Sequence, residues 1–405
     1  MTTYSVTPAL PAGLSLDAAT GVISGTPTTA ITTLNYRITA SNAGGSTFTI
    51  LSITVSPVPT RTYQGTASVG DFLTLAVNPG AQTITYTNYT NHQSGTVAYT
   101  VAADGGYAIT TANGGLIQAY EIPGFALVAA ANNTGPAANT TSLVTGLLQA
   151  PIALGGLEGK TYNYMQWRVS QGGMDLGTVA IDASGNASHT SYWPYGAMQA
   201  QLGMNQSPDV FSTGSFSAAS FLPSANGNYL TLADQGGGVD TIFATQGGFW
   251  VVDMDNGSMV SVPQASSSAF DPSTAGTYAA LAFTKNNAYV AGNSNVETGA
   301  GTVVHYTLTI SAAGVATLAD STGTALTSQP LVPVANTAYL QVNGGMPNPC
   351  PGLFTFRVTT GTVQQDVYVE FISGAILFAA YSYDTAQSPS QTVHYSYYYG
   401  VALKQ

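Results

Sequence analysis

The chain has 405 residues, of which 44% are hydrophobic and only 6% are charged, and its formal net charge is −11. This length allows about two to four domains with sizeable cores, and the hydrophobic content excludes a chain kept disordered by its charge. Only 7 residues are Lys or Arg, which argues against nucleic-acid and anionic-membrane partners, because both require clustered cations. The single cysteine, Cys350, excludes an intramolecular disulfide and a metal site built from several thiolates.

The composition also suggests where the protein works. Abundant Gly, Thr and Ser with few Lys and Glu residues favour an exported protein, so we expect an extracellular or cell-surface location. Residues 2–6 have the pattern of a strand and not of a signal peptide, so a signal sequence is not expected in this chain. No apolar run approaches the ~20 residues that a membrane-spanning helix requires, and we expect no membrane span here.

The first predicted unit is residues 1–57, which end at a stiff Pro-containing linker, residues 56–60. Its stretch YSVTPALPAGLSLDAATGVISGTPT (residues 4–28), followed by YRITASNAGGS (36–46) and ITV (53–55), resembles the bacterial He-PIG type of immunoglobulin-like domain. The resemblance implies an Ig-like β-sandwich of the kind strung in arrays on bacterial surface and secreted proteins. It implies a spacer or adhesive role and transfers no catalytic residue.

The start of this unit departs from the family pattern. Family members usually carry one or two strands before the Tyr-Ser-Val segment, which here begins at Tyr4. A sandwich without these strands exposes a sheet edge and part of its core. We therefore expect either a truncated module or one that another segment completes by adding a strand.

The rest of the chain predicts an all-β fold. Short alternating runs are broken by Gly, Asn, Asp or Pro, and hairpin turns are expected at residues 104–106, 184–186, 255–257 and 313–314. Only residues 142–149 and 194–204 are compatible with a turn or two of helix.

Three kinds of segment recur in the same order and indicate weak internal repetition. The segments are, first, RTY (61–63), KTY (160–162) and GTY (276–278); second, hairpins at 101–105, 181–185 and 310–314; third, Gly-centred strand pairs at 120–128, 243–252 and 368–378. We interpret these as three related units, residues 61–140, 158–262 and 273–405. Each is expected to be an antiparallel barrel of the lipocalin or streptavidin kind, or a sandwich.

No catalytic set emerges from the sequence. A Gly-x-Ser-x-Gly motif is absent, and His92, His189, His305 and His394 have no triad context. On residues 365–371 the alternation places Asp366, Tyr368 and Glu370 on one face, but a separation of ~13 Å between the two carboxylates exceeds that of glycosidase pairs. We interpret this face as solvated, with the interior of a barrel as the alternative place for it, and we expect no enzyme activity and no cofactor.

Two groups of residues are candidates for binding. Asp253 and Asp255 resemble the start of a calcium loop, although the bidentate Glu is missing and the Asn-Gly that follows is sufficient for a hairpin. Aromatic side chains suited to sugar rings or a partner protein are the second group: Trp193, Tyr195, Tyr395, Tyr397 and Tyr399. The alternative for the last three is a closing barrel strand whose tyrosines pack inward.

The sequence as a whole favours a non-enzymatic structural or adhesive protein of the bacterial surface or the secreted fraction. The first alternative binds carbohydrate or another small ligand through a barrel mouth or a Tyr-rich face. The second alternative is a self-associating filament subunit built by strand donation. The expected partners are other copies of the chain, other surface proteins or polysaccharide.

Overall fold

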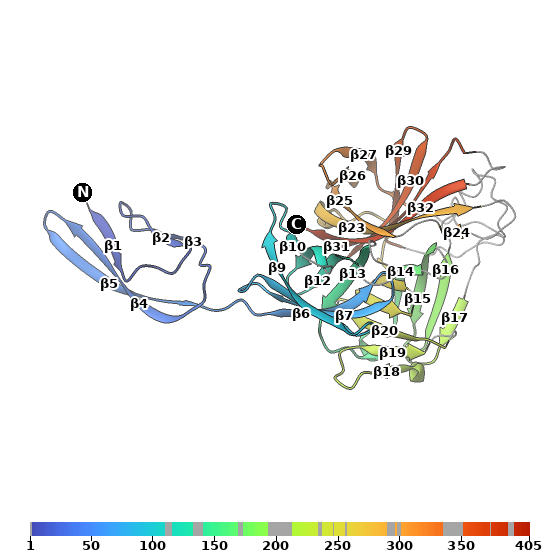
Figure 1. Ribbon diagram of the computed structural model, residues 1–405, viewed down its shortest axis with the longest axis horizontal. Coiled ribbons are helices and arrows are strands. Elements are labelled where there is room, and N and C mark those ends of the chain that lie inside the picture. Colours follow the sequence, from blue (N-terminus) through green and yellow to red (C-terminus); the bar gives the residue numbers. More distant parts are fainter. Residues whose placement is uncertain are drawn as a thin grey trace. The chain divides into compact units, whose positions relative to one another are not determined.

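The computed structural model describes residues 2–109, 116–132, 141–168, 173–192, 213–233, 237–245, 247–255, 257–289, 296–297, 301–334, 351–372, 374–387 and 393–405. Two compact units are distinguished: Met1–Arg61 with Ala76–Ile84, and Thr62–Leu75 with Thr85–Gln405. Strands dominate both units, and in the described ranges the helices are single 3₁₀ turns (Figure 1). This confirms the all-β fold. The 3₁₀ turns are η2 (Leu154–Gly156), η3 (Ala218–Ser220) and η4 (Pro272–Thr274).

The first unit is the expected Ig-like segment. A three-stranded antiparallel sheet has the order β1 (Thr3–Thr7), β4 (Ile31–Asn42), β5 (Gly45–Val55), and a ribbon pairs β2 (Leu14–Leu16) with β3 (Ile23–Gly25). Tyr36 is buried on the face that alternates with Arg37. The turn between β2 and β3 is closed by Asp17, whose carboxylate accepts backbone hydrogen bonds from Ala19 and Thr20. These bonds hold the pKa of Asp17 below its usual value.

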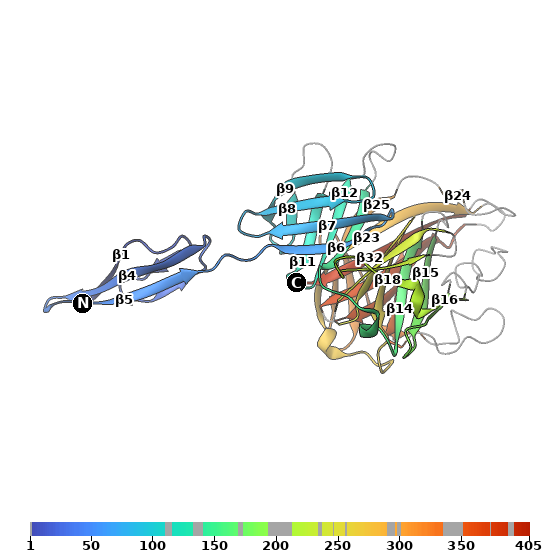
Figure 2. The same ribbon diagram turned by 90° about the horizontal axis from the view of Figure 1, so that it is seen from below.

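A closed eight-stranded barrel follows (Figure 2), and apart from Arg61 and residues 76–84 it belongs to the second unit. Its strands follow the chain as an up-and-down meander, and the last pairs with the first. They are β6 (Arg61–Ala67), β7 (Asp71–Asn78), β8 (Thr83–Asn88), β9 (Gln93–Val101), β10 (Tyr107–Ile109), β11 (Leu116–Ile122), β12 (Ala126–Asn132) and β13 (Thr141–Leu148). Residues 142–149, which are compatible with a turn or two of helix, are therefore strand as far as Leu148, and residues 194–204 lie outside the described residues. Pairing of β13 with two neighbouring strands overrides its weak local pattern.

The second sheet has nine strands in the order β17-β16-β15-β14-β22-β21-β20-β19-β18. It is also a meander, and β14, its first strand along the chain, pairs with β22, its last. Its two outer strands, β17 and β18, do not pair with each other, so the sheet stays open. Its strands are β14 (Lys160–Arg168), β15 (Gly173–Ile181), β16 (Ala187–Tyr192), β17 (Thr213–Phe216), β18 (Phe221–Pro223), β19 (Leu230–Ala233), β20 (Val239–Ala244), β21 (Trp250–Met254) and β22 (Gly257–Pro263).

The third sheet repeats this arrangement. Its order is β27-β26-β25-β23-β32-β31-β30-β29-β28, with β24 paired to β23, and it stays open between β27 and β28. The strands are β23 (Gly276–Tyr289), β24 (Val296–Glu297), β25 (Thr302–Ile310), β26 (Val315–Asp320), β27 (Ala325–Pro330), β28 (Val332–Pro333), β29 (Leu353–Thr360), β30 (Val363–Ile372), β31 (Ala375–Asp384) and β32 (Val393–Lys404).

Two of the three recurring sequence segments occupy equivalent places in the three sheets. The Thr-Tyr segments open β6, β14 and β23, and Tyr63, Tyr162 and Tyr278 are all buried. The Gly-centred pairs form the hairpins β11–β12, β20–β21 and β30–β31, which always precede the last strand. The second kind of segment is less regular: it joins β15–β16 and β25–β26, but in the barrel it joins β9–β10.

The three sheets share one hydrophobic core. Side chains from β12 and β13 of the barrel, from β14 and β22, and from β23, β31 and β32 belong to a single buried cluster. The concave sides of the second and third sheets hold separate cores, around Trp250 and Phe356 respectively. Each of these two sheets is therefore covered on both faces, which explains strands without a solvated side.

Closure of the barrel depends on close approach of β6 and β13. A Cβ added to Gly65 would lie 1.9 Å from the carbonyl oxygen of Thr145, and Gly146 lies beside it. We expect Gly65→Ala to lower the free energy of unfolding by about 3 kcal/mol, because backbone must move to make room. Urea unfolding measures the change, and Gly156→Ala is the control, since nothing lies within 4 Å of its added Cβ. Equal stability of the two variants would contradict tight β6–β13 packing.

Candidate functional site

The predicted aromatic binding row is buried. Tyr395, Tyr397 and Tyr399 lie on β32 in the shared core and are at most 3% exposed. The interpretation as an exposed platform is therefore not supported, and the alternative of inward-packed tyrosines describes what the structure shows. Alternation placed the three rings on one face correctly, but that face is covered by the second sheet. Trp193 and Tyr195 lie outside the described residues.

The buried tyrosines join the third sheet to the second. The hydroxyl of Tyr381 donates to the carbonyl of Met174 at 2.8 Å, and Ser258 Oγ donates to the Tyr399 hydroxyl at 3.4 Å. Trp167 packs edge-on against Tyr397, with ring centroids 5.9 Å apart. Burial raises the pKa of Tyr399. These rings act as internal packing and are not accessible to a sugar.

The weak calcium candidates also have a structural role. Asp253 is buried on β21, and its Oδ1 lies 2.6 Å from Thr66 Oγ1 of the barrel, which is also 3.0 Å from the carbonyl of Ala67. The Thr66 hydroxyl is the donor in both contacts. Burial, reinforced by Asp71, Asp240 and Asp255, raises the pKa of Asp253 to about 7, and the hydrogen bond from Thr66 lowers it only in part. In the described part of the chain, no group of three or more His, Cys, Asp or Glu residues could hold a metal ion.

Glu370 is the second buried acid. It lies on β30, is 2% exposed, and its Oε2 has no hydrogen-bond partner. Burial raises its pKa to about 8, and a hydrogen bond from Asn163 of β14 lowers it only partly. Asp366, Tyr368 and Glu370 do share one face, but that face is buried and the interpretation as solvated is wrong. Asp366 is instead paired with Arg357 through two hydrogen bonds.

A hydrogen-bonded chain of polar groups joins the barrel to the third sheet. The Tyr120 hydroxyl on β11 donates to Asp104 at 2.7 Å and lies 3.0 Å from His305 Nε2 on β25. Burial lowers the pKa of His305, although Asp104 opposes this. A buried or half-buried acid or histidine therefore lies at each contact between sheets: Asp253 between the barrel and the second sheet, Glu370 between the second and third sheets, and His305 between the barrel and the third sheet.

Glu121 of β11 is hydrogen-bonded by two tyrosines of the barrel. The hydroxyls of Tyr63 on β6 and Tyr107 on β10 both donate hydrogen bonds to the carboxylate of Glu121. The backbone N–H of Gly124 donates to the Tyr63 hydroxyl at 3.1 Å. Both carboxylate oxygens accept a hydrogen bond, so Glu121 links β11 to β6 and to β10 within the barrel.

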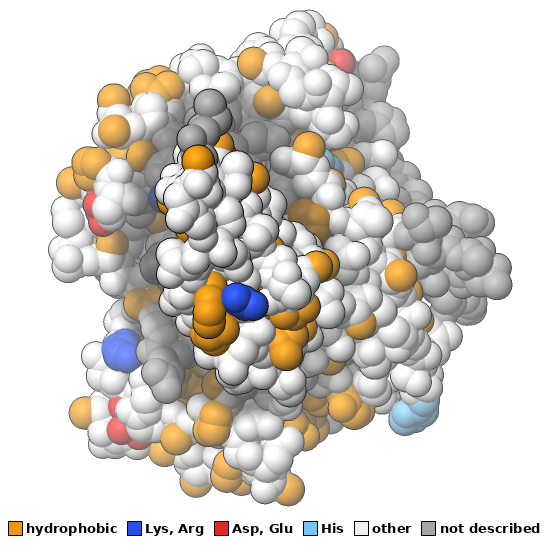
Figure 3. Space-filling view, turned by 90° about the vertical axis from the view of Figure 1, so that its left-hand side faces the viewer, with side chains coloured by type: hydrophobic (Ala, Val, Ile, Leu, Met, Phe, Trp, Pro, Cys, Tyr) orange, Lys and Arg blue, Asp and Glu red, His pale blue; other side chains and the backbone are white. Residues whose placement is uncertain are grey.

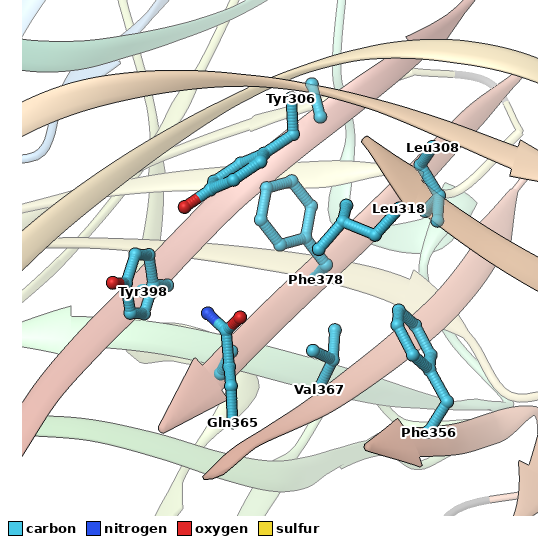
Figure 4. A pocket seen from close by; sticks show the side chains of 10 residues that line it. Tyr306, Leu308, Leu318, Phe356, Gln365, Val367, Phe378 and Tyr398 are labelled. Atoms are coloured by element: carbon cyan, nitrogen blue, oxygen red, sulfur yellow. The ribbon is translucent and has the colours of Figure 1, made fainter. Parts of the chain in front are cut away.

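A small internal pocket lies inside the third sheet (Figure 4). The hydroxyls of Tyr306 and Tyr398 and the amide of Gln365 lie at one end, and Leu318 and Phe356 lie toward the other. Burial, with Tyr398 beside it, raises the pKa of Tyr306. The cavity measures about 20 Å³, which is room for about one water and far below a ligand pocket.

An open depression of about 440 Å³ lies on the second sheet. It is lined by residues of β14 to β17 and of the turn between β15 and β16, including Lys160, Asp182 and Asn186. Asp182 is already engaged with Asn186 and the Ser184 N–H. The lining contains no aromatic ring on which a sugar could stack.

Exposed apolar side chains gather instead on β5 of the Ig-like unit. Phe48 and Ile50 are 55% and 52% exposed on one face, and Leu51 is 38% exposed on the other. The guanidinium carbon of Arg37 lies 4.0 Å above the Phe48 ring centroid, a cation–π contact. In a view onto this unit, hydrophobic side chains lie beside a basic one (Figure 3). The alternation of β5 could have revealed this face, but its exposure could not be read from sequence.

Comparisons with known proteins support the assignment of the first unit. Residues 1–56 match the family described as "Putative Ig domain", which confirms the resemblance. No curated protein matches the chain. In the described residues, no helix is long and apolar enough to span a membrane.

Solved structures similar to the chain include transferrin binding proteins B. A mutant of the vaccine antigen from Haemophilus parasuis is 8% identical, with 91% of this chain and 83% of that chain covered and a TM-score of 0.21. The isotype 1 protein from serogroup B Neisseria meningitidis is 12% identical, with 93% and 85% covered and a TM-score of 0.19. At these scores the likeness carries no argument about function.

Proposed function

We propose that this chain is a non-enzymatic structural or adhesive protein of the bacterial surface or the secreted fraction. The observation that carries the proposal is the contrast between the two units. In the second unit, called the body below, the acids and aromatic rings that could serve catalysis or sugar binding join one sheet to another. In the Ig-like unit, apolar side chains of β5 are presented to solvent. A tightly packed second unit linked to a module whose strand β5 exposes apolar side chains suits adhesion.

The three sheets of the body are proposed to be copies of one meander. The equivalent positions of the Thr-Tyr and Gly-centred segments support this proposal, and the irregular place of the β9–β10 hairpin is the exception. Copies of a meander give a stiff body from a simple pattern, which fits a structural role. The alternative of a small-ligand protein has less support, because the pocket of the third sheet is nearly filled.

We expect the fluorescently labelled full chain to be retained on intact bacterial cells or on insoluble matrix polysaccharide after washing. Phe48→Lys should reduce the retained fraction several-fold, because it removes an exposed ring and its contact with Arg37. Val239→Lys is the matched control, since Val239 is similarly exposed, at 53%, in the second sheet. Absence of retention on both surfaces would overturn the adhesive role, and hydrolysis of the polysaccharide would overturn the non-enzymatic one.

A further inference from the structure

The second sheet contacts its two neighbours through interfaces that each contain a buried acid. Glu370 of β30 lies where the third sheet meets the second, is 2% exposed, and its Oε2 has no hydrogen-bond partner among the described residues. Asp253 of β21 lies where the second sheet meets the barrel and is 8% exposed. A buried carboxyl group is tolerated when neutral, whereas its ionised form requires partners that replace water. The surroundings of each acid therefore decide what ionisation does to the interface.

The neighbours of Glu370 are mostly apolar. Leu353 on β29 and Leu377 on β31 lie opposite it in the sheet, and Asn163 of β14 supplies one hydrogen bond. The titratable side chains on the same faces of β30 and β31 are tyrosines: Tyr368, Tyr381 and Tyr383. One amide is too little to compensate for a buried charge, so the contact favours neutral Glu370.

The charged groups on the strands around Glu370 are bound elsewhere. Arg357 of β29 makes two hydrogen bonds to Asp366 of β30. The Nζ groups of Lys160 on β14 and Lys404 on β32 donate to backbone carbonyls. Strand β22, which also contacts β30, contains no charged residue. Ionised Glu370 would therefore be buried without a cation, in agreement with a pKa that burial raises to about 8.

Asp253 faces other acids. Burial raises its pKa, and Asp71 of the barrel, Asp240 of β20 and Asp255 of the following turn raise it further. The Thr66 hydroxyl of the barrel donates one hydrogen bond to it. Loss of the Asp253 proton would place a buried negative charge beside three more acids at the contact with the barrel.

The contact between the barrel and the third sheet has the opposite character. Burial lowers the pKa of His305 and raises that of Tyr120. Although burial opposes it, hydrogen bonds from Tyr120 and Gly106 hold the pKa of Asp104 below its usual value. These three side chains therefore keep the same charge between pH 7 and pH 9.

We propose that the second sheet is a layer held in place by protons: when Glu370 and Asp253 ionise, it separates from the third sheet and the barrel, which stay together. The sheet is one continuous segment, joined to its neighbours by residues 149–159 and 264–275, so it can move without breaking its own strand pairs. Separation uncovers an apolar face that includes Met165 and Trp167. The body thus contains an apolar surface that is covered at neutral pH and exposed in alkali.

The size of the effect follows from the proton balance. The closed form retains the Glu370 proton up to a pKa of about 8, whereas a solvated glutamate has lost it well below neutrality. Raising the pH therefore favours the open form until that pKa is passed. Between pH 6.5 and pH 9 the opening equilibrium should rise about 30-fold through Glu370 alone.

Thiol labelling tests the opening. In a Cys350→Ser background, Met174→Cys places a thiol on the second sheet where it meets the third, and Ile376→Cys places one in the separate core of the third sheet; both positions are fully buried. Ala130→Cys reports on the side of β12 that faces the third sheet. At pH 9, Met174→Cys should be alkylated at least about 10-fold faster than either control, because only its site opens locally.

The variant Glu370→Gln connects the opening to the acid. The ratio of Met174→Cys labelling without and with this substitution should grow about 30-fold between pH 6.5 and pH 9, and thiol ionisation cancels because each ratio is taken at one pH. A ratio that does not change with pH would overturn the proposal. Labelling of Met174→Cys no faster than that of Ile376→Cys would also overturn it, because the body would then open only by unfolding as a whole.

A second measurement needs no cysteine. A fluorescent dye that binds apolar surface should bind the unchanged protein more strongly at pH 9 than at pH 6.5, while the far-ultraviolet circular dichroism stays constant. Glu370→Gln and Asp253→Asn should each reduce this increase, and Glu158→Gln, on a partly buried side chain, should not. No increase in dye binding, or an increase accompanied by loss of the dichroism signal, would reject separation of the second sheet.

Discussion

The free energy of unfolding is expected to fall as the pH is raised from about 6.5 to about 8.5. Glu370 has a folded-state pKa of about 8 and Asp253 one of about 7, both raised mainly by burial. In the unfolded chain both acids have already lost their protons at these pH values. The folded state therefore binds more protons than the unfolded state, and raising the pH favours unfolding until the folded-state pKa is passed.

Other groups act outside this window. Asp17, like Asp271 and Asp320, has a lowered pKa from hydrogen bonds within its own turn, so its contribution is lost only in acid. His305 has a lowered pKa, and its stabilising effect is lost as the pH falls below about 6.5. Stability should therefore be greatest on the mildly acidic side of neutrality.

The variant Glu370→Gln isolates one of the two groups. It should reduce the stability difference between pH 6.5 and pH 8.5 by about 2 kcal/mol, because one group then no longer titrates over about 1.5 pH units. Urea unfolding at the two pH values measures this difference. Glu158→Gln makes the same chemical change on a side chain that is only partly buried. Identical pH dependence in Glu370→Gln and in the unchanged protein would show that Glu370 is already ionised at pH 6.5 in the folded state.

Trp167→Ala is expected to destabilise the body by about 3–5 kcal/mol. The ring is 1% exposed on β14 and packs edge-on against Phe283 and Tyr397 of the third sheet, at centroid distances of 5.2 and 5.9 Å. Removing it leaves a cavity in the core that the three sheets share. Denaturant unfolding monitored by circular dichroism measures the loss.

Trp167→Phe is the matched variant. The indole Nε1 has no hydrogen-bond partner, so phenylalanine removes an unsatisfied buried donor and keeps most of the packing. It should destabilise the protein by less than about 2 kcal/mol. Similar losses in both variants would indicate that the indole nitrogen is hydrogen-bonded and that burial of the ring is not the main contribution.

The sequence predicted which residues share a strand face, but rarely which other sheet covers that face. Alternation along residues 365–371 separated Tyr368 and Glu370 from Val367 and Val369 correctly, since the period of a strand is two. The same alternation could not say that a second sheet covers the polar face, because that contact joins β30 to strands more than a hundred residues earlier. The burial of Asp253 was missed for the same reason, whereas inward packing of Tyr397 had been the stated alternative to a binding platform.

The Ig-like segment was recognisable because its turns are local. Asp17 and Gly21 form their turn with neighbouring residues, so spacing in the sequence specifies it. Exposure of Phe48 and Ile50 was different: it depends on the absence of an opposing strand beside β5, and no residue within the strand reports that absence. Residues 142–149 are compatible with a turn of helix but form strand β13 as far as Leu148, because Thr145 and Gly146 pair with β6 and β12.

Each of the three sheets starts and ends on neighbouring strands: β6 beside β13, β14 beside β22, and β23 beside β32. The chain therefore enters and leaves a sheet at adjacent positions along its wall. A gene segment encoding one sheet could be duplicated or deleted without rerouting the rest of the polypeptide. Because the three sheets share one hydrophobic core, such a change would also have to cover the surface that a lost sheet exposes.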